Sequence, residues 1–376
     1  MSTGVSDRKE RNSSIELLRI VSMLMIVFCH FATHGGFEFA PSELTLPRFW
    51  WNAIEAGGNL GTDVFVLISG YFLICDRRPY PDLRHVLKFW GQVFFYSTVI
   101  FAVFCLTGLA GFSAKGLVKA LFPVSFGTWW FASAYFVLYL IHPFLNKLLA
   151  ACDRRGFQFI LLFLLTLWCV IPTFTTSYYQ SNSLVWFVTL YAVGGFIRRF
   201  GLFEGSKPLQ WLAAFLAVSL VRYLSAVVLI LIGTRFPFAG ENSLFFYGVQ
   251  SVPTFLSAVT LFMTFEKIKM RGAGLINLAA SASFGVYLIH DNPYVRHYIW
   301  QEVFKNSSCQ STALIIPYSI GVCLLVYAAA TLADLLRQQT AERLFMLAAD
   351  RVIPPVERAA SRAFDRIRQA VFGKEA

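Results

Sequence analysis

Long apolar runs separated by short polar stretches dominate the sequence. The runs fall at residues 15–36, 60–75, 87–109, 129–150, 157–175, 183–198, 210–233, 243–265, 274–298 and 312–336. Most approach the roughly 20 residues that a helix needs to cross about 30 Å of hydrocarbon, and they lack the two-residue alternation of a membrane strand. The pattern predicts an all-α, polytopic membrane helical bundle with about ten transmembrane helices in residues 1–336.

Basic residues between the runs indicate how the helices cross the membrane. When the Lys and Arg residues between the runs or near their ends are assigned to alternate sides, 25 fall on the side of the N-terminus and 6 on the other, and Arg222 is left in the middle of a run. Positive charge gathers on the cytoplasmic side of membrane proteins. We therefore expect a multi-pass protein of the bacterial cytoplasmic membrane with both termini in the cytoplasm.

Composition excludes several other classes of protein. Of the 376 residues, 57% are hydrophobic and 14% charged, whereas a soluble domain carries about 25% charged residues. The net charge of +11 lies in short clusters between runs and not on a basic face, so no nucleic-acid partner is expected. The seven cysteines show neither paired nor metal-type spacing. Glu16 and Arg19 interrupt the first run and no small-residue cleavage site follows it, which favours a permanent helix over a signal peptide.

The last forty residues differ from the rest of the chain. Residues 337–376 interleave basic and apolar side chains, which predicts a basic amphipathic cytoplasmic tail. A helix lying on anionic lipid of the bilayer and a partly ordered, solvated tail both fit this pattern.

Arg19 and His30 in the first run lie on one helical face. Eleven positions at ~100° each bring them within about 20° around the helix, and about 16 Å apart along it. Ionisable groups in hydrocarbon are costly and therefore mark candidate sites. A guanidinium at the inner mouth suits the phosphates of a long, thin donor such as a coenzyme A thioester, and an imidazole farther along suits proton transfer. A lipid-phosphate anchor for Arg19 and a packing hydrogen bond for His30 are the alternatives.

Polar residues near His30 extend this hypothesis. Asp63 is expected at the depth of His30, where its carboxylate would orient the imidazole, with a helix N-cap as the alternative. His34 lies four positions after His30, a spacing that zinc-binding helices also use. Neither a glutamate motif nor a Cys/His cluster accompanies it, so no metal is expected. Ser69 and Gly70 favour close helix packing over a nucleophile.

The ninth and fourth runs supply candidate substrate-binding residues. Tyr287 and His290 lie on the ninth run, and His290 is expected to approach the outer half of the membrane. There it would bind an acceptor or assist proton transfer, although a packing role is the alternative. Trp130 begins the fourth run, where either an interfacial aromatic belt or stacking on a sugar would explain it.

Four stretches resemble the membrane acyltransferase-3 family. Residues 15–31 contain Arg19, ten further residues and His30, which is the pattern of that family's first helix. Further matches are residues 61–74 (GTDVFVLISGYFLI), 129–147 (WWFASAYFVLYLIHPFLNK) and 283–290 (SFGVYLIH). The resemblance covers about residues 12–336.

The resemblance implies ten spans and transfer of acyl groups from cytoplasmic acyl-CoA to hydroxyls of envelope or secreted glycans. It also implies that Arg19 contacts the coenzyme and that His30 acts in catalysis. Family members often carry an arginine pair after the second span. This chain offers Arg77, Arg78, Arg84 and Lys88 there without a clear match. We expect phosphate contacts in that loop, at Arg84 and Lys88. No tightly bound cofactor is expected, because acetyl-CoA or another acyl-CoA is a co-substrate.

The leading hypothesis is a membrane O-acyltransferase, in its expected form an O-acetyltransferase. His30 would remove a proton from a sugar hydroxyl, Asp63 would orient His30, and Arg19 would hold the coenzyme. One rival is a transporter that exports a glycan or an acyl intermediate, although no internal repeat typical of transporters is visible. Another is a non-catalytic sensor or assembly module with the same fold.

Overall fold

The computed structural model describes residues 12–175, 182–270 and 272–372, and every regular element in these ranges is a helix. The α-helices are α1 (Ser13–His34), α2 (Leu46–Glu55), α3 (Gly57–Leu73), α4 (Leu83–Leu106), α5 (Ala114–Leu121), α6 (Trp130–Ala150), α7 (Arg154–Leu165), α8 (Ile171–Thr175), α9 (Ser183–Phe200), α10 (Pro208–Gly233), α11 (Pro237–Glu241), α12 (Val252–Lys267), α13 (Gly274–Ser281), α14 (Ser283–His290), α15 (Pro293–His297), α16 (Ile315–Arg337) and α17 (Arg343–Phe372). Short π or 3₁₀ turns are η1 (Thr166–Val170), η3 (Phe245–Tyr247), η4 (Tyr298–Val303), η5 (Asn306–Cys309) and η6 (Gln338–Glu342). The predicted all-α class is confirmed for these residues.

Several helices are suited to a membrane. Within the described residues, six stretches are long and apolar enough to cross one: Ser13–His34, Leu83–Leu106, Arg154–Thr175, Pro208–Gly233, Pro237–Lys267 and Ile315–Ala359. The remaining predicted runs are helical too, but α3 has only 17 residues, and α13 with α14 forms a shorter apolar stretch. A membrane protein is therefore supported, whereas the predicted count of about ten spans is not confirmed.

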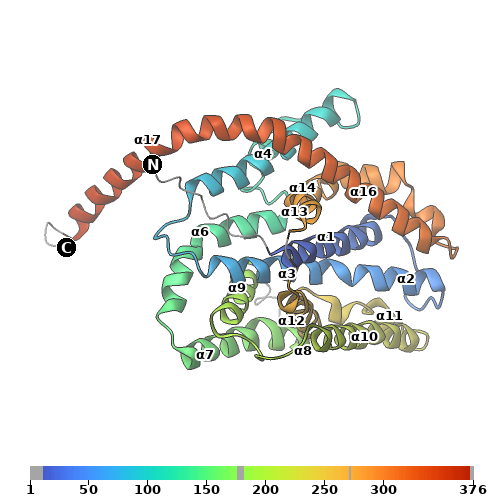
Figure 1. Ribbon diagram of the computed structural model, residues 1–376. Helices are drawn as coiled ribbons and strands as arrows, with labels where there is room; N and C mark the ends of the chain where they lie inside the picture. The colour runs from blue at the N-terminus through green and yellow to red at the C-terminus, as the bar shows by residue number, and fades with distance from the viewer. Residues whose placement is uncertain (1–11, 176–181, 271, 373–376) are drawn as a thin grey trace.

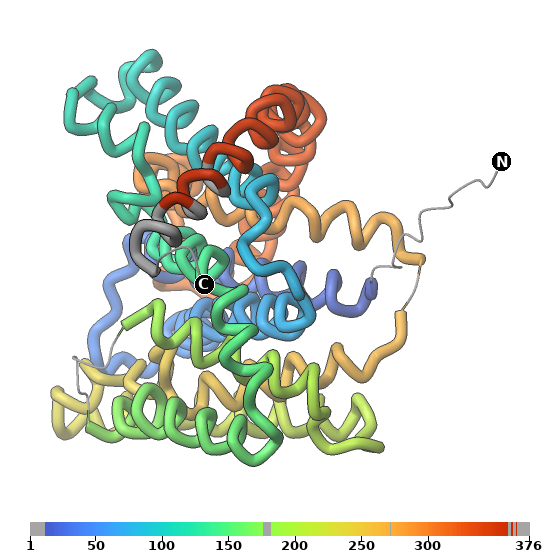
Figure 2. The backbone as a smooth tube through the Cα atoms, turned by 90° about the vertical axis from the view of Figure 1, so that its left-hand side faces the viewer, coloured from blue at the N-terminus to red at the C-terminus, as the bar shows by residue number. Residues whose placement is uncertain are grey.

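Helix α1 runs through the middle of the molecule beside α3 (Figure 1). Helices α10 and α12 lie on one side of this pair, and α4, α14 and α16 lie on the other (Figure 1), an arrangement that Figure 2 shows from a perpendicular direction. One apolar core joins α3, α9 and α12, and a second joins α1, α4, α14 and α16. Because α1 contributes to both cores, its polar residues are held from two sides.

Small residues let α1 and α3 approach closely. A Cβ on Gly61 would lie 2.6 Å from the Ser22 carbonyl oxygen, and one on Gly58 would lie 2.4 Å from Cys29 Sγ. Small residues commonly allow such close contact in membranes, because no hydrophobic effect drives helices together in lipid. The glycines thus decide which face of α3 meets α1.

A polar network ties the loop between α3 and α4 to α6. Pro143 lies inside α6 and has no N–H to donate to Tyr139 O. His142 Nδ1 lies 2.6 Å from that oxygen and donates in its place, while its Nε2 lies 3.2 Å from Asp76 Oδ2. Hydrogen bonds from Arg78 to the same carboxylate hold the pKa of Asp76 below its ordinary value. This loop is therefore fixed by charge-assisted bonds.

Helices α16, η6 and α17 form one continuous helix that crosses the molecule in Figure 1. The first part of α17 packs on the start of α4, where Met346, Ala349 and Ile353 form a small apolar cluster with Leu83 and Leu87. The end of the predicted tail, residues 373–376, lies outside the described residues, as do the basic residues of the first eleven positions.

Candidate active site

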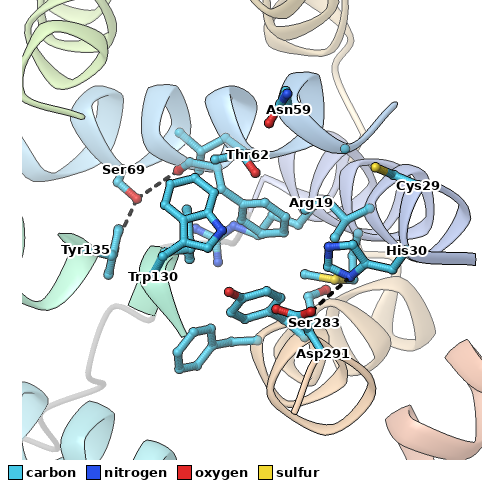
Figure 3. A pocket seen from close by; sticks show the side chains of 18 of the residues that line it. Arg19, Cys29, His30, Asn59, Thr62, Ser69, Trp130, Tyr135, Ser283 and Asp291 are labelled. Carbon is cyan, nitrogen blue, oxygen red and sulfur yellow. Dashed lines mark hydrogen bonds and ion pairs between the residues drawn. The ribbon is translucent and has the colours of Figure 1, made fainter. Parts of the chain in front are cut away.

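A cavity of about 560 Å³ lies between α1, α3, α6 and α14. Both Arg19 and His30 line it, as the shared helical face predicted. Figure 3 shows Tyr135 and Trp130 of α6 on the opposite side of this space from His30 and Asp291. The two residues singled out in the first helix therefore open into one compartment.

The His30 end of the cavity holds a compact group of ionisable side chains. His30 Nδ1 lies 2.9 Å from His290 Nε2 and 3.7 Å from Asp291 Oδ1. His34 Nε2 lies 3.5 Å from the same carboxylate oxygen, and Arg296 NH1 lies 3.6 Å from it. Residues of α1 and of the α14–α15 region, about 260 positions apart in sequence, thus meet at one point.

The ring tautomers are assigned from the hydrogen-bond partners. His290 Nδ1 lies 2.6 Å from Val286 O, and a carbonyl only accepts, so this nitrogen carries the hydrogen. In the neutral ring Nε2 then accepts, and His30 Nδ1 donates to it. His30 Nε2 is left with the lone pair, which is the form that a general base requires.

The end of α14 explains how this group forms. Asn292 caps the next helix by accepting a hydrogen bond from Tyr294 N, and Pro293 occupies the first position of α15. Proline disfavours helical backbone in the residue before it, so α14 stops at His290. Asp291 follows as the C-cap residue, and its carboxylate turns toward α1.

The Arg19 end is built more loosely. The Arg19 side chain is about one-third exposed, and it forms an ion pair of 3.7 Å with Glu16 of the same helix. Phe89 of α4 and Ser281 of α13 also line the cavity. A guanidinium held in this way can rearrange to meet an incoming anion.

A comparison with protein-family models matches residues 12–333 to the family described as an acyltransferase domain. The match includes all the residues that line the cavity. The chain belongs to the acyltransferase-3 family. Searches of curated proteins and of solved structures gave no match.

In this membrane acyltransferase Asp63 does not lie beside His30, contrary to the expectation from sequence. Gly61 faces α1, and Asp63 is two residues, about 200°, farther around α3. Its carboxylate points toward α9 and accepts a hydrogen bond of 2.9 Å from Trp186 Nε1. Among the described residues, the carboxylate paired with His30 is that of Asp291.

The predicted substrate-binding residues lie in or behind the cavity wall. Tyr287 and Trp130 both line the cavity, and Trp130 is 45% exposed. His290 is fully buried and contacts His30 directly. It can therefore position His30, but it is too enclosed to bind an acceptor itself.

Arg84 and Lys88 lie in a second, smaller cleft of the acyltransferase, between α4 and the start of α17. Arg84 Nε is 2.8 Å from Asp350 Oδ1, and Lys88 Nζ is 2.7 Å from Glu342 Oε1. Both predicted phosphate contacts thus have carboxylate partners from the tail, which the sequence did not indicate.

The cleft and the main cavity are neighbours. Phe89 lines the cavity and adjoins Lys88 of the cleft. Gln338, which lines the cleft, donates a hydrogen bond of 3.2 Å to Ser281 O, and Ser281 lines the cavity. The two spaces therefore share a wall formed by α4, α13 and η6.

Three further polar residues of the cavity were not predicted to take part. Ser69 Oγ and Tyr135 Oη, which line the cavity, are hydrogen-bonded at 3.0 Å. Glu55, at the end of α2, also lines the cavity, and its Oε2 has no hydrogen-bond partner within the described part of the chain. Glu55 lay outside every predicted run, so periodicity gave no sign of it.

Proposed function

We propose that this membrane acyltransferase moves an acyl group, in the simplest case acetyl, from cytoplasmic acyl-CoA to a hydroxyl of an envelope or secreted glycan in bacteria. The observation that carries the proposal is the shared cavity of Arg19 and His30. Their axial separation of about 16 Å suits a donor bound at one end that reacts at the other. On the predicted topology, the Arg19 end faces the cytoplasm.

The coenzyme would use both spaces. Its nucleotide phosphates would bind in the cleft near Arg84 and Lys88, which would exchange their tail carboxylates for phosphate oxygens. Arg19 would hold the donor where its arm enters the cavity. The Ser69 and Tyr135 hydroxyls would then meet the amide groups of the arm, and the thioester would reach His30.

His30 would act as the general base. Its Nε2 takes the proton of an acceptor hydroxyl while the oxygen attacks the thioester carbonyl carbon. As the tetrahedral intermediate collapses, the C–S bond breaks and the coenzyme thiolate takes the proton back from Nε2. His290 accepts from Nδ1 throughout and fixes the tautomer, and the Asp291 carboxylate stabilises the transient imidazolium.

The acceptor would enter from the end of the cavity near Trp130 and Tyr287. Aromatic faces stack on the apolar faces of sugar rings, and the exposed ring of Trp130 is placed for this. The free carboxylate oxygen of Glu55 would accept a hydrogen bond from a sugar hydroxyl.

The test is turnover by the purified chain. Acetyl-CoA and an envelope glycan fraction should yield free coenzyme and a glycan whose mass increases by one acetyl group. The glycans of deletion and complemented cells should differ by the same increment. Flux of glycan across vesicles without thioester consumption would instead support transport, and coenzyme binding without turnover would support a sensor.

A further inference from the structure

The group at the His30 end has the make-up of a metal site. Donor atoms of His30, His34 and Asp291 lie within 4.8 Å of one another, and His290 Nε2 adds a fourth donor 2.9 Å from His30 Nδ1. Three imidazoles with one carboxylate form a ligand set that Zn²⁺ and its neighbours in the transition series favour. Calcium and magnesium prefer oxygen donors.

The spacing of these donors fits a tetrahedral ion. Zinc binds nitrogen and oxygen at about 2.0–2.2 Å, which places neighbouring ligand atoms about 3.3–3.5 Å apart in a tetrahedron. The separations are 2.9 Å for His30 to His290, 3.7 Å for His30 to Asp291 and 3.5 Å for His34 to Asp291. These three pairs therefore lie within about 0.6 Å of the tetrahedral spacing.

The surroundings of His290 point to a ligand as well. A metal-binding histidine commonly donates its other ring N–H to a carbonyl or carboxylate, which fixes the ring and its tautomer. His290 makes such a bond, from Nδ1 to Val286 O. At the end of α1, Gln301 Nε2 donates to His34 O at 2.9 Å and holds the backbone of that ligand.

One nearby charge opposes a bound cation. Arg296 NH1 lies 3.6 Å from Asp291 Oδ1, and its side chain is 40% exposed. The site therefore offers one carboxylate that is already shared with a guanidinium. Such a site suits reversible binding better than permanent retention of the metal.

We propose that His30, His34, His290 and Asp291 bind a divalent transition-metal ion, with Zn²⁺ the best fit, and that this ion inhibits acyl transfer. An ion on His30 Nδ1 displaces the hydrogen that this nitrogen shares with His290. The neutral ring then carries its hydrogen on Nε2, which can no longer accept a proton. Metal binding and general-base catalysis at His30 exclude each other. The inhibition rests on the proposed function, whereas the binding site does not.

Direct binding is tested with the purified full chain in detergent. Co²⁺ should give the visible absorption of a tetrahedral complex, and Zn²⁺ should remove that absorption at one ion per chain. His34→Gln should weaken Zn²⁺ binding at least about tenfold, since even loss of an outer-shell partner costs ~10- to 100-fold. The matched control is His297→Gln, because His297 is exposed and lies outside the group. Equal Zn²⁺ binding by the two variants would overturn the site.

A second variant distinguishes loss of a metal ligand from misfolding of the protein. His34→Cys replaces one zinc ligand by another, so it should keep Zn²⁺ binding. With Co²⁺ it should also gain a thiolate-to-metal charge-transfer band, which a distant cysteine cannot produce. Absence of that band in a variant that still binds Co²⁺ would place the metal elsewhere and refute the assignment.

Activity measurements separate the two proposals. Zn²⁺ should inhibit acyl transfer by the wild type at the concentrations that saturate the site, and the activity that His34→Gln retains should no longer respond to Zn²⁺ at these concentrations. Full activity of the wild type with Zn²⁺ bound would disprove the proposal that a metal ion on His30 prevents general-base catalysis. Zn²⁺ binding by a chain that transfers no acyl group would leave the metal site standing and reject the proposed function.

Discussion

The two ends of the cavity are held in different ways. At the His30 end, side chains from α1 and from the end of α14 contact one another at 2.9–3.7 Å, and the Val286 carbonyl fixes the orientation of the His290 ring. At the other end, Arg19 has an ion pair of 3.7 Å within its own helix and stays about one-third exposed. A preorganised group suits chemistry, while a loosely held cation suits capture and release of a substrate. Substitutions at the two ends test whether this division holds.

The largest loss of activity is expected at the His30 end of the cavity. His30→Ala removes the proposed proton acceptor and should lower kcat by about 10²- to 10⁴-fold, at unchanged expression in membranes. Acyl transfer to glycan measures this. His297→Ala is the control, because it removes an exposed histidine outside the cavity. Wild-type turnover by His30→Ala would remove His30 from the mechanism.

A smaller loss of kcat is expected for substitutions of His290, which contacts His30. His290→Ala removes the hydrogen-bond acceptor of His30 Nδ1, so the hydrogen of the His30 ring is no longer held on Nδ1. The value of kcat should therefore fall by roughly 10- to 100-fold. The KM for acyl-CoA should stay unchanged, because His290 does not touch the donor. His290→Gln offers a carbonyl acceptor and should recover part of kcat. Equal falls in both variants would indicate a structural role instead.

At the Arg19 end of the cavity, substitutions should change the KM for acyl-CoA more than kcat. Arg19→Ala should raise the KM for acyl-CoA by about tenfold, because a hydrogen bond to a charged group is worth ~1.5–3 kcal/mol and partial exposure favours the lower limit. Arg19→Lys keeps the charge and should recover part of the affinity. With an acyl-pantetheine donor, which lacks the nucleotide, Arg19→Ala should behave like the wild type. An equal defect with both donors would contradict phosphate binding.

The smallest effect concerns stability at acidic pH. Arg78 lowers the pKa of Asp76, so this carboxylate stabilises the fold above its unfolded pKa of about 4. That contribution disappears as pH falls through the folded pKa. The difference in Tm between wild type and Asp76→Asn should therefore shrink from about pH 5 to about pH 3. A difference that stays constant over this range would show that charge on Asp76 does not contribute.

The sequence predicted the arrangement along one helix better than contacts between helices. The common face of Arg19 and His30 follows from helical geometry alone, and the cavity confirms it. The pairing of Asp63 with His30 required knowing which face of α3 meets α1, and glycine contacts decide that. The partnership of Asp291 with His30 depends on helix packing across some 260 residues, which no local pattern encodes.

The number of spans illustrates a similar limit. Hydropathy located every run, and helices occupy most of each run where the structure describes it. The first part of the eighth run, before α12 begins at Val252, forms turns and η3, and the ninth run is interrupted after His290. Helix α3 ends after 17 residues. Length and composition alone therefore support fewer spans than the pattern of runs suggested.

The continuous helix from α16 through η6 to α17 connects the wall of the main cavity to the cleft beside α4. Its Gln338 donates a hydrogen bond to Ser281 in the cavity wall. Farther along, Glu342 and Asp350 form ion pairs with Lys88 and Arg84 of α4. Because these contacts lie on one continuous helix, a displacement of the start of the tail would reach the cavity wall and the cleft together.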